Sequence, residues 1–364
     1  MKAIETKVLP APEPDDPDDA RIEEEEAAGH IEFLSGLAYF EIGIFSKARD
    51  FFIKALKRHG IALPPDDNKL QIKAALLKAK SRLWRRHWLP GCSHKNTNDT
   101  EMREGFNENF ATTLRILSYL NVLYTRERKL DMALLVTMWQ VITAEKYGNP
   151  VQDVLAAYSN MMDVMVAKSD LNEAHIYEKL SLELIRSTFG SLDQVEPIGL
   201  ISSANAFYTI ASVRLYRGDL TASTDAAYIA LRIAQTVHDN MLIMRTLPNL
   251  FFGLLMTLKI SEVVQTLQKL WFTAEEEEDP TAVALYYTGC LDILLNTAYP
   301  VEPFGVCEHF VLHCDWSQES NVLREHELQF AMESCLALWY CRYSRWDTAR
   351  KWITITGMKK LLYY

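Results

Sequence analysis

Segments with helical spacing of apolar residues follow one another from about residue 23 to residue 362. Proline and glycine fall mainly between these segments, and the whole chain of 364 residues contains only 14 Gly and 13 Pro. Because helix interiors tolerate neither residue well, the pattern predicts an all-α fold with almost no β-strand. The scarcity of glycine also argues against glycine-rich phosphate loops and turn-rich β-sandwiches.

The same spacing gives the expected helices and their connections. Short turns separate most of them, which is typical of antiparallel helix pairs. We expect helices over residues 23–42, 46–59, 68–88, 101–125, 130–147, 151–168, 171–189, 198–216, 220–237, 241–257, 261–274, 280–296, 303–314, 321–342 and 346–362.

Small and aromatic residues near the start follow the frame of a tetratricopeptide (TPR) repeat. In such a repeat, small residues let the two helices approach each other and aromatic residues fill the space between repeats. The usual Trp and Leu are absent, since Glu32 and Ser35 stand at their positions. The residues expected to pack this first repeat are Gly36, Tyr39, Gly43, Ala48, Phe52 and Ala55.

Weaker copies of the frame occur later in the chain. One copy has Arg214 where the tyrosine would stand and Ser223 where the first alanine of the second helix would stand, and its expected packing residues are Ala211, Gly218, Ala227 and Ala230. Tyr124 with Ala133, Ala174, and Ala337 with Tyr340 and Ala349 repeat parts of it. The spacing is longer than the ~34 residues of a regular repeat. We therefore predict an irregular TPR-like α-solenoid of antiparallel helix pairs.

Charge and loop-forming residues suggest how the chain is divided. Residues 1–30 hold ten acidic and three basic residues, whereas the net charge of the whole chain is -10. We expect an acidic disordered tail over 1–22, TPR-like helices over 23–88, a loop over 89–100 (LPGCSHKNTNDT) and a TPR-like repeat region over 101–364. An acidic, proline-containing segment with few large apolar residues cannot bury enough surface to fold.

No linear signature of catalysis is found, since Walker A, dinucleotide-binding, zincin and nucleophile-elbow motifs are all absent from the sequence. The strongest candidate metal ligands are Cys307, His309, His313 and Cys314, which could share one side of a helix. The intervening Phe310, Val311 and Leu312 favour a buried structural helix instead. We therefore expect no catalytic residue, metal or cofactor in this chain.

A basic amphipathic segment, KLQIKAALLKAKSRLWRRHWL, covers residues 69–89. Its basic residues could form an interaction face for calmodulin, an acidic membrane surface, a partner's acidic face or the chain's own acidic tail. We favour an ordinary solenoid helix with a basic outer side, and expect Ala74, Leu76 and Leu77 to be buried. Nucleic acid is not expected as a partner, because the pI is about 5.5. The candidate face comprises Lys73, Lys80, Arg82, Arg85 and Arg86.

Six irregularly spaced cysteines and an acidic N-terminus indicate a cytoplasmic protein with reduced thiols and no secretion signal. The most apolar stretch, residues 247–260, is too short to span a bilayer, so no transmembrane segment is expected.

The phrase GLAYFEIGIFSKARDFFIKALKRHGIALP and the later stretches from ANAFYTIASVRLYRGD to LALWYCRYSRWDTARKW resemble the C-terminal helical repeats of the soluble adenylyl cyclase family, adenylate cyclase type 10. The resemblance covers most of residues 30–352. In that family, N-terminal cyclase domains make cyclic AMP from ATP with divalent metal, and neither these domains nor the ATPase module is found here. The resemblance therefore implies a distal piece, whether fragment, isoform or partial gene model, with no catalytic residue carried over.

Two functions follow as hypotheses. The first is a non-catalytic regulatory or scaffolding region that binds cyclase or ATPase domains of the same family, or peptide ligands. The alternative is a free-standing TPR-like scaffold for protein-protein interaction, unrelated to cyclic AMP signalling.

Overall fold

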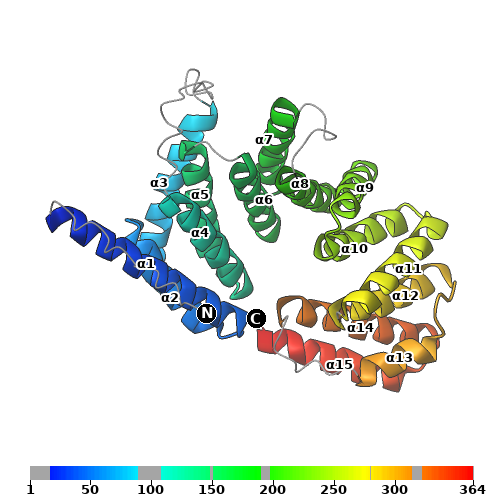
Figure 1. Cartoon of the computed structure of the whole chain (residues 1–364). Helices are drawn as coiled ribbons and strands as arrows, with labels where there is room; N and C mark the ends of the chain where they lie inside the picture. Colours follow the sequence, from blue (N-terminus) through cyan, green and yellow to red (C-terminus); the bar gives the residue numbers. More distant parts are fainter. Residues whose placement is uncertain are drawn as a thin grey trace, which may run out of the picture. The chain divides into compact units, whose positions relative to one another are not determined.

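The computed structural model describes residues 17–88, 108–147, 151–189, 197–278, 280–313 and 322–363. These residues form fifteen α-helices and no β-strand, which confirms the predicted all-α class (Figure 1). The helices are α1 (Pro17–Glu41), α2 (Phe45–Arg58), α3 (Lys69–Trp88), α4 (Glu108–Arg126), α5 (Leu130–Tyr147), α6 (Val151–Ala167), α7 (Leu171–Phe189), α8 (Pro197–Tyr216), α9 (Leu220–Thr236), α10 (Asn240–Met256), α11 (Ile260–Glu277), α12 (Pro280–Thr297), α13 (Phe304–His313), α14 (Val322–Arg342) and α15 (Trp346–Tyr363).

The chain divides into two compact units, Met1–Leu123 and Tyr124–Tyr364, so the boundary falls within α4. The loop expected over 89–100 lies outside the described residues, as do residues 1–16 of the expected tail. Helix α1 begins at Pro17 rather than at residue 23. Proline suits the first position of a helix.

The core of unit 1 is built around the fully buried Phe52 of α2. Its ring stacks on Tyr119 of α4, with 5.3 Å between centroids, and lies 6.1 Å from Phe33 of α1. A Cβ atom added to Gly36 would lie 2.7 Å from the Phe52 ring, so only glycine fits at this crossing of α1 and α2. Ala48 and Ala55 are also fully buried, and Tyr39 is half-buried with its ring stacked on Phe51.

Unit 2 is a series of paired helices, in which α6 packs on α7, α8 on α9, α10 on α11 and α14 on α15. The first helices of successive pairs also contact each other, as α6 does with α8 and α12 with α14. This is the layered packing of an α-solenoid, in which each repeat buries its apolar face against its neighbours. Ala211, Ala227 and Ala230 are fully buried between α8 and its neighbours.

One turn geometry joins the helices of six pairs. In each turn a single residue has positive φ, and the N–H of the next residue donates to the carbonyl five residues back at 2.8–3.0 Å. This is the Schellman arrangement that ends many helices. The six residues of positive φ are Gly43, Arg128, Ser169, Gly218, Leu258 and Ser344.

Five residues after each of these turn residues stands a buried side chain in the second helix. Its N–H donates to the carbonyl of the residue that follows the turn residue. These positions are occupied by Ala48, Ala133, Ala174, Ser223, Val263 and Ala349, all at most 1% exposed. The turn thus fixes which residue of the second helix packs against the first helix, and that residue is mostly small. The same spacing occurs in repeats of different length.

Replacing Gly218 by Ala tests the backbone requirement of these turns. An added Cβ would meet no atom within 4 Å, so the cost comes only from the positive φ of 80°. We expect a loss of about 1 kcal/mol in unfolding free energy, measured by urea denaturation. The control is Gly305→Ala, where an added Cβ also meets nothing and φ is not positive. An equal loss in both variants would contradict this explanation.

Candidate interaction surfaces

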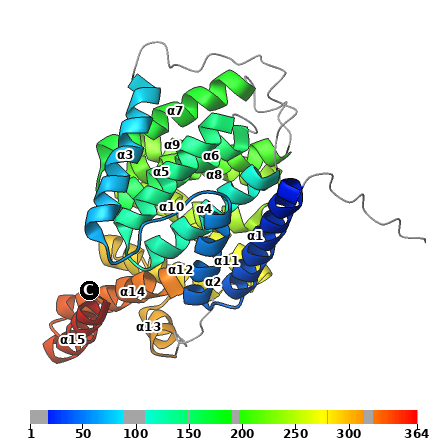
Figure 2. The ribbon, with the colours of Figure 1, turned by 90° about the vertical axis from the view of Figure 1, so that its left-hand side faces the viewer.

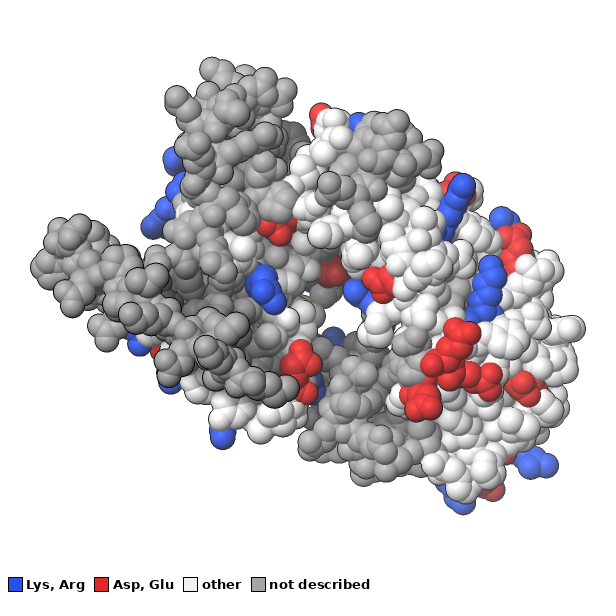
Figure 3. Space-filling view, viewed as in Figure 1, with Lys and Arg blue, Asp and Glu red and all other residues white. Residues whose placement is uncertain are grey.

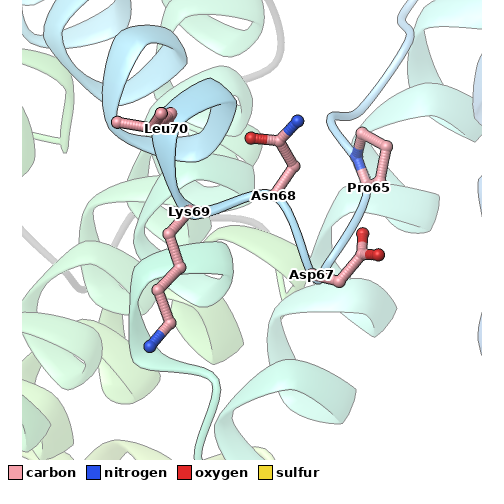
Figure 4. Close-up of a pocket in the computed structure, with 5 residues that line it drawn as sticks. All are labelled: Pro65, Asp67, Asn68, Lys69 and Leu70. Carbon is pink, nitrogen blue, oxygen red and sulfur yellow. The ribbon is translucent and has the colours of Figure 1, made fainter.

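The expected basic segment forms α3, whose start is fixed by local sequence. Asn68 caps the helix, since its Oδ1 accepts the backbone N–H of Gln71 at 3.1 Å. Figure 4 shows Pro65, Asp67 and Asn68 in the segment before the helix, with Lys69 and Leu70 on its first turn. These five residues line a shallow, open depression.

Helix α3 carries apolar residues on two opposite sides. Ile72, Ala79 and Leu83 are buried. Leu70, Leu77 and Trp84 are 81%, 71% and 57% exposed.

The expectation of burial at Ala74 and Leu77 is therefore wrong, and Leu76 is only half-buried. The reason is geometric: Leu77 and Ala74 lie roughly opposite the buried Ile72 and Ala79 at 100° per residue, on the exposed side of the helix.

The basic residues predicted for this segment surround the exposed apolar row. Lys73, Lys80, Arg82 and Arg85 are exposed, and Arg86 is half-buried. Figure 3 shows Lys and Arg side chains along the edge of the molecule at α3. The helix contains seven Lys or Arg residues and no Asp or Glu.

A second surface lies on the first helices of the pairs in unit 2. Each of these helices is followed by a residue of positive φ: Ser169, Gly218, Leu258, Ala298 or Ser344. The surface consists of the residues six and two positions before these residues, which share one side of their helices. We call this set the first-helix face. It comprises Asp163 and Ala167 of α6, Ser212 and Tyr216 of α8, Phe252 and Met256 of α10, Asp292 and Asn296 of α12, and Leu338 and Arg342 of α14.

Side-chain contacts connect neighbouring helices along the first-helix face. Asn249 Nδ2 of α10 donates to Ser212 Oγ of α8 at 2.6 Å. The Arg245 guanidinium lies over the Tyr208 ring, 4.8 Å from its centroid. Between α12 and α14 the face is hollowed by a depression of about 400 Å³, lined by Asp292, Leu295, Asn296, Leu338, Cys341 and Arg342.

The first-helix face is chemically mixed. Tyr216, Met256 and Leu338 are well exposed, and Phe252 is partly exposed, beside the amide, hydroxyl and carboxyl groups named above. In the view of Figure 3, Lys and Arg lie interspersed with Asp and Glu over unit 2. Such a surface offers hydrogen bonds and apolar contact area to an extended protein segment rather than a single dominant charge.

A buried carboxylate links α7 to α8. Glu178 accepts a hydrogen bond from Arg214 Nε at 2.6 Å, and Arg217 Nη1 lies 3.5 Å from its other oxygen. His175 Nδ1 lies 2.8 Å from Glu178 Oε2 and 2.7 Å from Arg217 Nη1. Arg214 also donates to the carbonyl of Ala222 in α9 at 3.1 Å. The cluster ties three successive helices together, and we assign it a structural role.

The candidate metal ligands do not converge. Cys307 is fully buried and faces Cys290 of α12, whose thiol is its hydrogen-bonding partner. His309 and His313 are exposed and stack on each other with 4.0 Å between centroids. Cys314 lies outside the described residues, and among those described no group of three or more His, Cys, Asp or Glu side chains could hold a metal.

Burial changes the pKa of several groups around α12. Hydrogen bonding to Cys307 and burial raise the pKa of the Cys290 thiol above its usual range, and the same hydrogen bond lowers that of Cys307. Burial raises the pKa of Asp292, whose Oδ1 accepts from the Cys335 thiol at 3.3 Å. These thiols are buried, so they lack the accessibility of a reactive cysteine.

Asn249, Ser212 and Arg245 were not predicted as site residues from the sequence. Only Ser212 had a positional signal, since it stands six residues before the turn residue Gly218. The frame around Leu258 was missed because Leu254 stands where three other turns have Tyr, and Val263 stands where the other turns have Ala or Ser. No described helix is both long and apolar enough to traverse a lipid bilayer.

Together these features define an all-α, TPR-like helical repeat protein. A Rap protein complexed with competence and sporulation factor has a similar fold, with a TM-score of 0.58 over 95% of this chain and 80% of that one at 12% identity. No family model matches the sequence.

Among curated proteins, the chain is similar to adenylate cyclase type 10. The mouse protein (Mus musculus) is 26% identical over 144 residues, which is 39% of this chain and 9% of that protein. The rat protein (Rattus norvegicus) is 31% identical over 94 residues, which is 26% of this chain and 6% of its own length. The human protein (Homo sapiens) is 24% identical over 176 residues, 48% of this chain and 10% of its own. The matches thus span a tenth or less of these relatives.

Proposed function

We propose that this chain is a non-catalytic regulatory or scaffolding region related to the C-terminal repeats of adenylate cyclase type 10. The observation that carries the proposal is the first-helix face, a row of mostly exposed residues repeated at equivalent positions of successive helix pairs. Its occupant would be a protein segment, either from cyclase or ATPase domains of the same family or from a separate peptide ligand. Catalysis with ATP and divalent metal would belong to those other domains.

Two observations support this function. The partial similarity to adenylate cyclase type 10 recurs in mouse, rat and human proteins. The Rap protein of similar fold is itself complexed with a factor, which fits a ligand-binding solenoid. As the compartment we propose the cytoplasm, because six irregularly spaced cysteines do not suggest a disulfide framework.

The test is to mix the purified chain with a separately expressed pair of cyclase domains and to measure both binding and cyclic AMP production. We expect binding and a changed rate. The variant Phe252→Ser with Met256→Ser, on the first-helix face, should weaken binding by about tenfold or more, because hot-spot truncations cost ~2 kcal/mol.

The matched control is Phe272→Ser, a more exposed aromatic side chain (63% against 37% for Phe252) on the second helix α11. It should leave binding unchanged. Binding without dependence on the first-helix face would refute the assignment of the surface. Absence of binding by the wild-type chain would refute the link to cyclase and favour the free-standing scaffold.

A further inference from the structure

The uncovered side of α3 is an amphipathic surface that the repeat architecture does not use. Leu70, Leu77 and Trp84 stand seven residues apart, so they form a nearly straight row spread over only about 40° of the helix circumference. Ala74 and Ser81 lie beside this row and are also exposed. The row covers a length of about 20 Å along the helix. We call it the α3 row.

Basic side chains flank the α3 row on both sides. Lys73 lies within one turn on one side, and Lys78 and Arg85 lie on the other, all of them exposed. Long Lys and Arg side chains can extend their charged ends away from an apolar row while their methylene groups continue it. The surface therefore combines apolar contact in the middle with positive charge at both margins.

We propose that the α3 row binds the surface of an anionic lipid membrane, with α3 lying in the plane of the headgroups. Helices that bind in this way pair Leu and Trp on one side with Lys and Arg beside them and depend on anionic lipid. The opposite side of α3 is anchored through Ile72, Ala79 and Leu83, so the row is already ordered in the folded chain. Binding would not have to offset the cost of forming the helix.

The shape of the surface favours a membrane over a protein partner. The α3 row runs along a single helix, whose backbone Figure 2 shows lengthwise, and an exposed row on one helix is convex. Leu70, at the start of the row, also lines the open depression before α3. A helical protein partner needs a groove to surround its apolar side chains. The interface of a lipid membrane can accommodate a convex row of side chains, with Trp84 at the depth of the headgroups.

The experiment is vesicle flotation of the full chain. One set of vesicles is pure phosphatidylcholine, and in the other about a third of the lipid is phosphatidylserine. We expect binding to the anionic vesicles at least tenfold tighter than to the neutral ones, weakened by added salt, because each flanking base contributes about fivefold.

Two variants separate the contributions of the surface. Leu77→Gln with Trp84→Gln removes the apolar row, and Lys73→Glu with Arg85→Glu reverses the flanking charge. Each should reduce anionic-vesicle binding about tenfold or more. The matched controls Phe272→Gln and Lys269→Glu change exposed residues of α11 and should bind as the wild type does.

Three results would overturn the proposal. One is no flotation with anionic vesicles. Another is binding that the α3 variants leave unchanged. The third is an α3 that binds an acidic amphipathic peptide but no vesicle, which would make the row a protein-docking site instead.

Discussion

Replacing Phe52 by Ala is expected to lower the free energy of unfolding of unit 1 by about 3–5 kcal/mol. The ring is fully buried and contacts the rings of Phe33 and Tyr119 and the backbone of Gly36. Its removal leaves a cavity that α1 and α2 cannot close without shifting. Urea denaturation followed by circular dichroism measures the loss, and Phe272→Ala, at an exposed position, should change stability by less than about 0.5 kcal/mol.

A second substitution shows whether the loss comes from packing at the crossing of α1 and α2. In the native chain, Gly36→Ala should destabilise, because the new Cβ would lie 2.7 Å from the Phe52 ring. In the Phe52→Ala background that ring is gone, so the same change should stabilise by about 0.5–1 kcal/mol through the higher helix propensity of alanine. Equal effects of Gly36→Ala in both backgrounds would show that the two residues do not interact.

The loss should also remain local. In a solenoid each repeat contacts only its neighbours, so instability spreads poorly along the chain. Hydrogen exchange monitored by mass spectrometry should become faster in α1 and α2 of the Phe52→Ala variant, while α8 to α11 keep the wild-type rate. Equal acceleration in all helices would mean that the chain unfolds as one cooperative unit.

The sequence was sufficient for the helices and for the frame of the first repeat. Helical spacing between prolines placed most boundaries correctly, and the Gly36 and Phe52 pair follows from the small and aromatic pattern. The backbone conformation of the other turns could not be predicted in this way, because Arg128, Ser169, Leu258 and Ser344 adopt positive φ without being glycine. Their conformation is imposed by the two helices that they join.

The interaction surfaces were harder to predict than the fold. Periodicity shows that α3 has apolar residues at helical spacing, but Ile72 and Leu77 both fit such a pattern on opposite sides. Only the packing of unit 1 decides which side is covered. The first-helix face likewise forms only when successive helix pairs stack on each other. Ser212 and Asn249, for example, are 37 residues apart in the sequence and yet form a hydrogen bond.

Replacing Glu178 by Leu is expected to destabilise unit 2 by about 3 kcal/mol, because it breaks a buried ion pair and leaves the other charge behind. The Glu178 side chain is 4% exposed and that of Arg214 is 21% exposed, so solvent can compensate the guanidinium only in part. Arg214 stands where Tyr39, Tyr124 and Tyr340 stand in other turns, since all four carbonyls accept the equivalent turn hydrogen bond. Arg214→Tyr alone should also destabilise, because Glu178 loses its closest partner.

The double variant, Glu178→Leu with Arg214→Tyr, should recover most of the lost stability. It removes both charges at once and places a tyrosine where other repeats have one. Replacing a buried ion pair by well-packed apolar residues often leaves stability unchanged or raises it. A double-mutant cycle from urea denaturation gives the coupling between the two sites. The control is Lys168→Ala, which breaks a more exposed ion pair with Asp131 and should cost less than about 1 kcal/mol. If the losses of unfolding free energy add up in the double variant, Glu178 and Arg214 stabilise the repeats through separate contacts. They would then not act as a pair that takes the place of an aromatic contact.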